Sequence, residues 1–337
     1  MKIRIVLADT DEKYINHFIR AFKIYYFNEV DIVTFSDLTA LKKYISSRAY
    51  DILLSVASLL PKEAEGKGMI LTSEMGIKEI NGRPAICKYQ KIENLYKGIL
   101  DAIAEQKSGI TYSYETSKES PVIAFTSAAG GVGKTTAALV YTRQLVKKGF
   151  QVMYLSLESF SNIDYFLNAE GSSNFSNVLF AVKCGKGNLQ MKIESSLKQT
   201  YGGVYFFSKP MNPNEIDELD QSEWKEFLDA VRAVGKFHCI VIDLPCANED
   251  TAKKIMPLSD RVLFITDGSD TTTEKTQTLM TCISKYDEVN GADLSTKVSV
   301  IQNKCEGPRR EIGLPILAEL PYIKETRMEK LIMDTLV

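Results

Sequence analysis

The chain has 337 residues, of which 45% are hydrophobic and 25% are charged, and its formal net charge is −2. This length and apolar content are sufficient for two domains with sizeable cores. The near-neutral charge excludes a general electrostatic attraction to nucleic acid or to anionic lipid, so nucleic acid is not expected as a partner.

The cysteines are scattered, and none has the Cys-x-x-Cys spacing of a metal or redox motif. They are Cys87, Cys184, Cys239, Cys246, Cys282 and Cys305. We expect them to be reduced core thiols of a cytoplasmic protein. The N-terminal run Met1–Ala8 lacks the pattern of a signal sequence, and no apolar run approaches the length of a membrane-spanning helix. Direct insertion into a membrane is therefore not expected.

Strand-like and helical patterns alternate through residues 1–107, the predicted first domain. The apolar runs of strand length are Ile3–Ala8, Asp31–Phe35, Asp51–Val56, Met69–Thr72 and Ala85–Lys88. Helical spacing follows the first run and fills the last segment, Ile92–Ala104. Five such units predict a doubly wound parallel sheet of flavodoxin-like order.

Polar residues at the ends of these strands resemble those of response-regulator receiver domains. They are Asp9, Asp11, Thr72 and Lys88. Val56, however, stands where a receiver has its phospho-accepting aspartate, and Tyr89 replaces the proline that usually follows the lysine. Because valine offers no nucleophile, we expect an atypical receiver that accepts no phosphate and acts as a docking or dimer surface. A generic α/β lid is the alternative.

A polar segment without periodicity, residues 108–120, separates this domain from the next. It reads SGITYSYETSKES and ends before Pro121. Its composition is typical of a linker, so we place the second domain at residues 121–337.

The second domain opens with PVIAFTSAAGGVGKTTAALVYTRQLVKKG, which predicts a buried strand at Val122–Ser127 and a helix at Lys134–Lys148. A glycine-rich turn between strand and helix presents backbone N–H groups and the helix N-terminus to a phosphate. The expected contacts of the nucleotide are Gly130, Gly131, Val132, Gly133, Lys134, Thr135 and Thr136. Lys134 supplies a charge to the β- and γ-phosphates, and Thr135 supplies a hydroxyl to Mg²⁺.

This stretch resembles the deviant Walker A motif of the MinD/ParA group of P-loop ATPases, Gly-Lys-Gly-Gly-x-Gly-Lys-Thr-Thr. Ala128 stands in place of the first glycine, and Ala129 in place of the signature lysine that reaches the partner's nucleotide across the dimer. The resemblance implies an ATP-binding homodimer, and the missing lysine implies slow hydrolysis.

Two carboxylates follow later strands of this domain. Glu158 comes after the strand Gln151–Leu157, where the resemblance implies a residue that orients the attacking water, with a solvated strand-end glutamate as the alternative. Asp243 ends the run FHCIVIDLP, which has the form of a Walker B motif. We expect Asp243 and Thr135 to hold Mg²⁺, and Lys134, Glu158 and Asp243 to act in hydrolysis.

Further segments of this domain also resemble those of MinD/ParA ATPases. Asn174–Val182 and Met211–Val234 are expected to be helices, and Arg261–Thr266 and Lys297–Gln302 buried strands. The resemblance implies that Asn303 reads the adenine edge and that a loop with Pro321 and Tyr322 closes over the base. The guanine-specific Asn-Lys-x-Asp motif is not met after Asn303.

A receiver-like domain joined to a MinD/ParA-like domain resembles the TadZ/CpaE family of pilus-assembly proteins. The resemblance implies a dimer that localises components of the secretion machinery of type IV (Flp/Tad) pili, at a cell pole or at the inner face of the membrane. The alternative is a positioning or partitioning ATPase that acts on membrane or DNA. A metabolic P-loop enzyme would need residues for a second substrate, and the sequence shows no such group. An iron–sulfur reductase would need bridging cysteines after the Walker B region, and Cys246 has no companion at that spacing. The C-terminal stripe after Thr326 has no basic face, so we expect it to pack on protein rather than on lipid.

Overall fold

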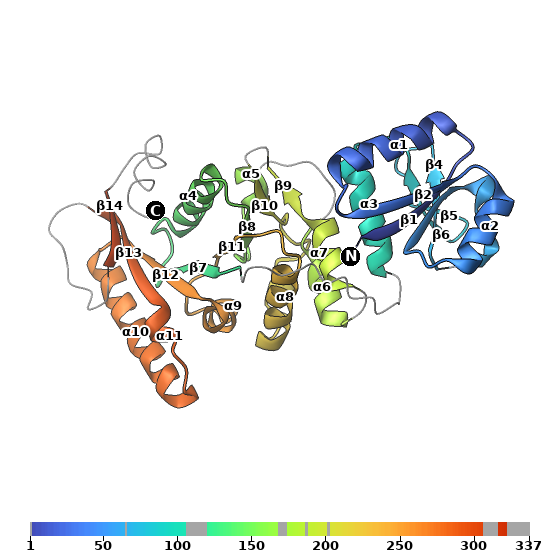
Figure 1. The fold of residues 1–337 in the computed structure, drawn as a ribbon. Helices are drawn as coiled ribbons and strands as arrows, with labels where there is room; N and C mark the ends of the chain where they lie inside the picture. The colour runs from blue at the N-terminus through green and yellow to red at the C-terminus, as the bar shows by residue number, and fades with distance from the viewer. Residues whose placement is uncertain are drawn as a thin grey trace. The chain divides into compact units, whose positions relative to one another are not determined.

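The computed structural model describes residues 2–64, 66–105, 120–167, 174–185, 188–200, 203–305 and 316–321. The chain forms two compact units, which are described separately below (Figure 1). Unit 1 comprises Met1–Tyr114 and Cys184–Ser196, and unit 2 comprises Glu115–Lys183 and Leu197–Val337. Apart from Ser120, the predicted linker lies outside the described residues, as does the C-terminal stripe.

Unit 1 is built on a six-stranded sheet in the order β2-β1-β3-β4-β6-β5. Its strands are β1 (Ile3–Ala8), β2 (Val30–Phe35), β3 (Ile52–Val56), β4 (Gly68–Thr72), β5 (Glu79–Ile80) and β6 (Arg83–Cys87). All neighbouring pairs are parallel except β5 with β6. The parallel strands have the predicted flavodoxin-like order, and the short hairpin strand β5 is added at one edge.

Helices cover both faces of this sheet. The helices α1 (Glu12–Tyr25) and α3 (Ile92–Glu105) share one core, whereas α2 (Leu38–Ser47) packs on the opposite face (Figure 1). Helix α1 begins where Asp11 accepts hydrogen bonds from the backbone N–H groups of Lys13 and Tyr14, and it buries an i, i+4, i+8 stripe of aromatic residues, Tyr14, Phe18 and Phe22.

The expected strand-helix alternation fails after β3. Among the described residues, the connection from β3 to β4 carries only the 3₁₀ turns Ala57–Leu59 and Lys62–Ala64, and the connection from β4 to β6 carries β5. Pro61 and the positive-φ glycines Gly66, Gly76 and Gly82 punctuate these short segments and oppose helix formation. Asn81 and Gly82 both have positive φ, as the tight turn between two antiparallel strands requires.

A segment from the second half of the sequence belongs to unit 1. Helix α7 (Leu189–Ser196) packs along α3, and Met191 lies in the core that α1 and α3 share. Lys192 Nζ lies 2.7 Å from Asp101 Oδ1, and the backbone N–H of Asn188 donates to the carbonyl of Ala104. Residues 188–196 are thus anchored by both apolar and polar contacts.

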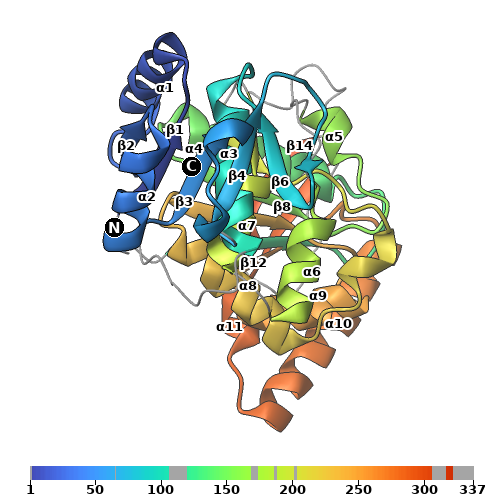
Figure 2. The same ribbon diagram turned by 90° about the vertical axis from the view of Figure 1, so that its right-hand side faces the viewer.

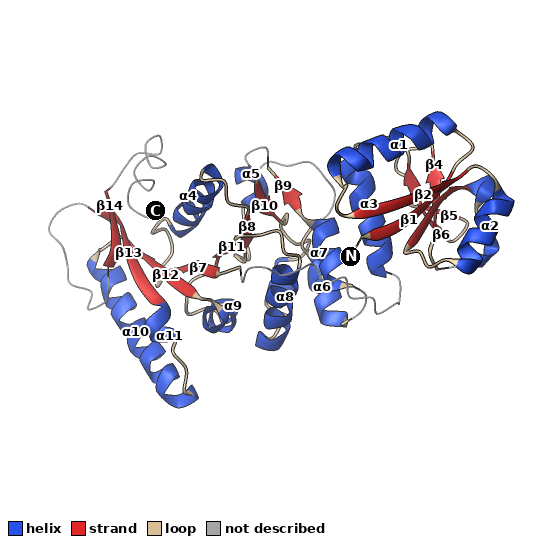
Figure 3. Ribbon diagram, viewed as in Figure 1, coloured by secondary structure: helices blue, strands red, loops and turns tan. Residues whose placement is uncertain are grey.

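Unit 2 is built on an eight-stranded sheet in the order β14-β13-β12-β7-β11-β8-β10-β9. Its strands, shown in red in Figure 3, are β7 (Val122–Thr126), β8 (Val152–Ser156), β9 (Lys198–Gln199), β10 (Val204–Phe206), β11 (Cys239–Asp243), β12 (Arg261–Thr266), β13 (Val298–Cys305) and β14 (Ile316–Pro321). Among the strands that the structure describes here, only the β9–β10 pair is antiparallel. The chain is therefore an α/β protein with two parallel-rich sheets, as predicted.

The helices of unit 2 lie on both sides of its sheet. Helix α4 (Lys134–Lys147) lies on one side, and α8 (Gln221–Ala233), α9 (Asp250–Ile255) and α10 (Asp270–Asn290) lie on the other (Figures 1 and 2). The short helices are α5 (Ile163–Phe166), α6 (Ser176–Cys184) and α11 (Leu294–Lys297). The predicted stripe of α8 is fully buried, since Trp224, Phe227 and Val231 are each 0% exposed.

The thiols differ in their accessibility, which corrects the expectation that they are core residues. Cys87 and Cys239 are buried, Cys246 is half-buried, and Cys184 and Cys282 are exposed on α6 and α10. Burial raises the pKa of the Cys239 thiol to about 12, and the nearby Asp260 carboxylate adds to the rise. At neutral pH Cys239 therefore carries almost no thiolate.

We expect iodoacetamide at neutral pH to alkylate Cys184 and Cys282 in the native protein and to leave Cys239 unmodified, because the thiolate is the reactive species. Peptide mass spectrometry of the native protein, compared with protein alkylated in urea, measures this. Equal labelling rates for Cys239 and Cys282 would contradict the burial of Cys239.

Candidate functional site

The phosphate-binding loop joins β7 to α4 and has the geometry that its glycines predict. Gly131 and Gly133 have φ of 77° and 94°, in the left-handed region that disfavours side chains. A Cβ atom on Gly133 would also lie 2.4 Å from Asn303 Nδ2. Glycine at position 133 is thus required both by the backbone conformation and by the close approach of Asn303.

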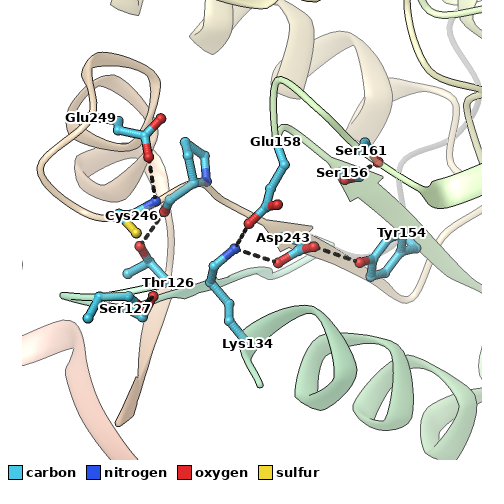
Figure 4. Close-up of polar contacts among 12 residues, drawn as sticks. Thr126, Ser127, Lys134, Tyr154, Ser156, Glu158, Ser161, Asp243, Cys246 and Glu249 are labelled. Atoms are coloured by element: carbon cyan, nitrogen blue, oxygen red, sulfur yellow. Dashed lines mark hydrogen bonds and ion pairs between the residues drawn. The ribbon is translucent and has the colours of Figure 1, made fainter. Parts of the chain in front are cut away.

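Lys134 is the first residue of α4, and its ammonium lies between two carboxylates (Figure 4). Its Nζ contacts the Glu158 carboxylate and lies 3.2 Å from Asp243 Oδ1. Burial alone would lower the pKa of this ammonium, but the carboxylates of Asp243 and Glu158 outweigh burial and raise it. Lys134 is therefore a protonated, 6% exposed cation at the mouth of the loop.

Asp243 ends β11, and its carboxylate is 0% exposed. Lys134 Nζ donates to Oδ1 at 3.2 Å, and the hydroxyl of Tyr154 donates to Oδ2 at 3.0 Å (Figure 4). Hydrogen bonding from the Thr135 side chain acts to lower the pKa of the Asp243 carboxyl. Burial raises the pKa of the Asp243 carboxyl by more than the neighbouring Lys134 lowers it. The structure thus brings together the predicted residues Lys134, Thr135, Glu158 and Asp243.

The donor set at Asp243 fits Mg²⁺. A carboxylate and a threonine hydroxyl are hard oxygen ligands of the kind that Mg²⁺ prefers. They meet next to the phosphate-binding loop, where a buried carboxylate needs a cation to offset its desolvation.

Tyr154 is a site residue that sequence reasoning missed, because it lies within a run of apolar strand residues. The register of the sheet pairs Tyr154 of β8 with Val241 and Ser156 with Asp243 on the parallel strand β11. Tyr154 is 1% exposed, and both burial and the Asp243 carboxylate raise the pKa of its phenol. It is therefore a hydrogen-bond donor that holds the Asp243 carboxylate in place. A polar aromatic residue on the strand beside the Walker B strand is the signal that could have identified it.

We expect Tyr154→Phe to lower the free energy of unfolding of unit 2 by about 1.5–3 kcal/mol, because a buried hydrogen bond to a charged group is lost. Urea unfolding followed by the fluorescence of Trp224, the single tryptophan of the chain, measures this. Tyr141→Phe, on α4, is the matched control and should shift the free energy by less than about 0.5 kcal/mol. An unchanged Tyr154→Phe midpoint would argue against the role of the phenol.

Strand β13 braces the phosphate-binding loop through two consecutive side chains. Asn303 Nδ2 donates to the carbonyl of Val132 at 2.8 Å, and Lys304 Nζ donates to the carbonyl of Gly131 at 2.7 Å. The adenine-reading role of Asn303 stays a prediction, and Lys304 was not anticipated. Pro321 is the last residue of β14, but its side chain, like all of Tyr322, lies outside the described residues.

The remaining loop residues lie at the surface of the site. Gly130, Gly131 and Thr136 are exposed, and Ala129 is half-buried, with its carbonyl accepting a hydrogen bond from the Ser127 hydroxyl. The backbone N–H of Ala247, which follows the strand that Asp243 ends, donates to the carbonyl of Ser127 at 2.9 Å. That N–H is therefore engaged with the protein in this structure.

Unit 1 brings the receiver-like residues Asp9 and Lys88 together but has valine in place of the phospho-accepting aspartate. Lys88 Nζ lies 2.9 Å from Asp9 Oδ2, and both side chains are buried. Val56 ends β3 at the position expected for the phosphorylated aspartate. The ion pair gives Asp9 a structural role in this unit.

We expect no labile adduct on unit 1 after incubation with acetyl phosphate, because Val56 has no nucleophilic group. Intact-mass measurement of the full chain before and after incubation tests this. One hydroxylamine-labile phosphate per chain would show that a carboxylate serves as the acceptor.

The topology and the glycine loop of unit 2 define a P-loop NTPase fold of the MinD/ParA type. Two family models match the chain, that of the TadZ-like receiver domain over residues 1–104 and that of the AAA domain over residues 120–296. The chain belongs to the AAA domain family, in its ParA/MinD-type branch, and carries a TadZ-like receiver domain before it. No curated protein matches the chain in sequence.

Solved structures support the fold of unit 2. A ParA family ATPase from Chlorobium tepidum TLS has a TM-score of 0.53 at 14% identity, covering 64% of this chain and 96% of that protein. Cobyrinic acid a,c-diamide synthase from Mycobacterium smegmatis, with bound ADP and magnesium, has a TM-score of 0.50 at 14% identity, covering 64% and 92%. At these identities the likeness establishes the fold alone. Among the described residues, each helix is too short or too polar to cross a membrane.

Proposed function

We propose that unit 2 binds ATP with Mg²⁺ and hydrolyses it slowly. The observation that carries this proposal is the convergence of Lys134, Asp243 and Glu158 at the end of the phosphate-binding loop. Bound Mg²⁺ would neutralise charge on the phosphates. Thr135 and Asp243 would hold it, with Tyr154 fixing the carboxylate.

Lys134 has to exchange partners when ATP binds. Its ammonium is engaged by two carboxylates in this structure, and the phosphates would compete for the same charge. Release from Lys134 frees Glu158, which is 37% exposed in its side chain, to accept a hydrogen bond from water. Glu158 then orients that water for attack, as we propose for the hydrolytic step.

We further propose that the chain is a homodimeric localisation protein for the assembly of type IV (Flp/Tad) pili, recruited to a cell pole or to the inner face of the membrane. The TadZ-like receiver domain supports this reading over the alternative, a positioning or partitioning ATPase that acts on membrane or DNA. Position 129 carries alanine in place of the signature lysine, which also disfavours fast cycling between nucleotide states.

The test is to identify the nucleotide released from purified, denatured protein, and to size the native protein by light scattering with and without ATP–Mg²⁺. We expect adenine nucleotide in the released fraction and a dimer with ATP. Release of guanine nucleotide alone, or a monomer at saturating ATP, would refute the corresponding part of the proposal.

A further inference from the structure

Unit 1 has a cavity of about 670 Å³ beside its buried ion pair. It lies between the beginning of α1 and the turn that follows β6. The residues that line it include Asp11, Lys13, Tyr14, Met75, Lys88 and Tyr89. A volume of about 300–1,000 Å³ is usual for a small-molecule site.

The charges around this cavity favour an anion. Lysines outnumber the single aspartate, and Asp11 is already engaged, because Oδ1 accepts hydrogen bonds from the backbone N–H groups of Lys13 and Tyr14. Asp9 is likewise engaged with Lys88. The ammonium of Lys13 is exposed and, among the described residues, has no hydrogen bond or ion pair. An incoming anion thus meets a cation that no carboxylate has neutralised.

Two tyrosine rings give the cavity a flat, apolar side. Lys88 Nζ lies 4.9 Å from the centroid of the Tyr14 ring and 5.6 Å from that of Tyr89. Tyr89 is 55% exposed, and Met75, at the rim, is 76% exposed. An exposed ring and thioether beside a cation provide a stacking surface that an aromatic ligand can cover.

A buried donor beside the cavity also lacks a partner. The hydroxyl of Tyr14 is covered and, within the part of the chain that the structure describes, makes no hydrogen bond. Burial raises the pKa of this phenol, and the Asp9 carboxylate adds to the rise, so it remains a donor. The Tyr89 ring packs edge-on against the Tyr14 ring, with their centroids 6.1 Å apart, so the two rings line the cavity together. An unpaired buried hydroxyl is costly, so a ligand acceptor there would be favoured.

We propose that this cavity binds a phosphorylated small molecule with an aromatic ring, of the mononucleotide class, through the Lys13 ammonium and the Tyr89 ring. The site lies in unit 1 and does not depend on ATP binding to the P-loop of unit 2. A receiver domain without an acceptor aspartate would in this way respond to a soluble anion rather than to phosphorylation.

The test is titration of the full chain with AMP, with GMP and with inorganic phosphate, each read by the acylation rate of individual lysines. We expect AMP or GMP to slow the acylation of Lys13 at least about fivefold at saturation, since bound phosphate lowers the free ammonium's access to reagent. Lys43, exposed on α2 at the opposite face of the sheet, is the internal control and should react at an unchanged rate.

Variants separate this site from the P-loop. Tyr89→Ala should weaken nucleotide binding to unit 1 by up to about tenfold, the equivalent of one stacking contact, and this is measured as weaker protection of Lys13 from acylation. Lys43→Glu and Thr135→Ala should leave it unchanged, and circular dichroism checks that each variant is folded. Unchanged Lys13 acylation with both nucleotides at millimolar concentration overturns the proposal. Inorganic phosphate that protects Lys13 as well as the nucleotides do overturns the assignment to an aromatic ligand.

Discussion

Replacing Lys134 by alanine is expected to weaken ATP binding at least about tenfold, since charge-assisted hydrogen bonds contribute roughly 1.5–3 kcal/mol each. Lys134 is a charged side chain at the end of the glycine loop, and it is already protonated and oriented by Asp243 and Glu158. Isothermal titration calorimetry of the wild type and the variant with ATP–Mg²⁺ measures the loss.

Lys134→Ala also lowers the stability of the protein without ATP, and this effect must be distinguished from the loss of ATP binding. Removal of Lys134 leaves the 0% exposed Asp243 carboxylate without its cation, and breaking a buried ion pair typically costs about 3–5 kcal/mol. Thr135→Ala leaves the ion pair intact and should weaken binding only when Mg²⁺ is present. Lys147→Ala, exposed at the end of the same helix, should bind ATP as the wild type does. Unchanged affinity in folded Lys134→Ala would refute the nucleotide assignment.

The strands of both units were predictable because their signal is local. The run Ile3–Ala8 is β1 as predicted, and β12 has the predicted bounds Arg261–Thr266. Buried parallel strands are continuous apolar runs, so their lengths can be taken from the sequence alone. The sequence analysis wrongly extended the alternation of strands and helices beyond β3. The connecting segments there are too short and too rich in glycine to form helices.

Long-range partners were harder to predict. The placement of α7 in unit 1 depends on Met191 packing among residues from the first hundred positions, which no local pattern reveals. The contacts of Lys304 with Gly131 and of Tyr154 with Asp243 likewise join residues far apart in the sequence. Motif spacing predicted that Lys134, Thr135 and Asp243 would lie together, as they do, whereas the residues that position them follow no fixed spacing.

Introducing a lysine at Ala129 is expected to raise the rate of ATP hydrolysis by up to about 10³-fold, the lower end of what a charge supplied in trans contributes to phosphoryl transfer. The wild type should turn over well below the enzyme median of about 10 s⁻¹, because Ala129 offers no charge. Ala129 is half-buried, and only its backbone carbonyl takes part in the Ser127 hydrogen bond, so a longer side chain leaves that bond intact.

A single-turnover assay of the wild type and Ala129→Lys, with sizing by light scattering, measures both rate and dimerisation. Lys304 is the cation that could substitute for the missing lysine, since its Nζ already donates to the carbonyl of Gly131. Ala129→Gln is the matched control for side-chain length, and it should not raise the rate. If Lys304→Ala abolishes the residual hydrolysis while ATP affinity is unchanged, Lys304 supplies the charge and the composite site differs from the one proposed. If Ala129→Lys dimerises with ATP and yet turns over no faster than Ala129→Gln, the missing lysine does not explain slow hydrolysis.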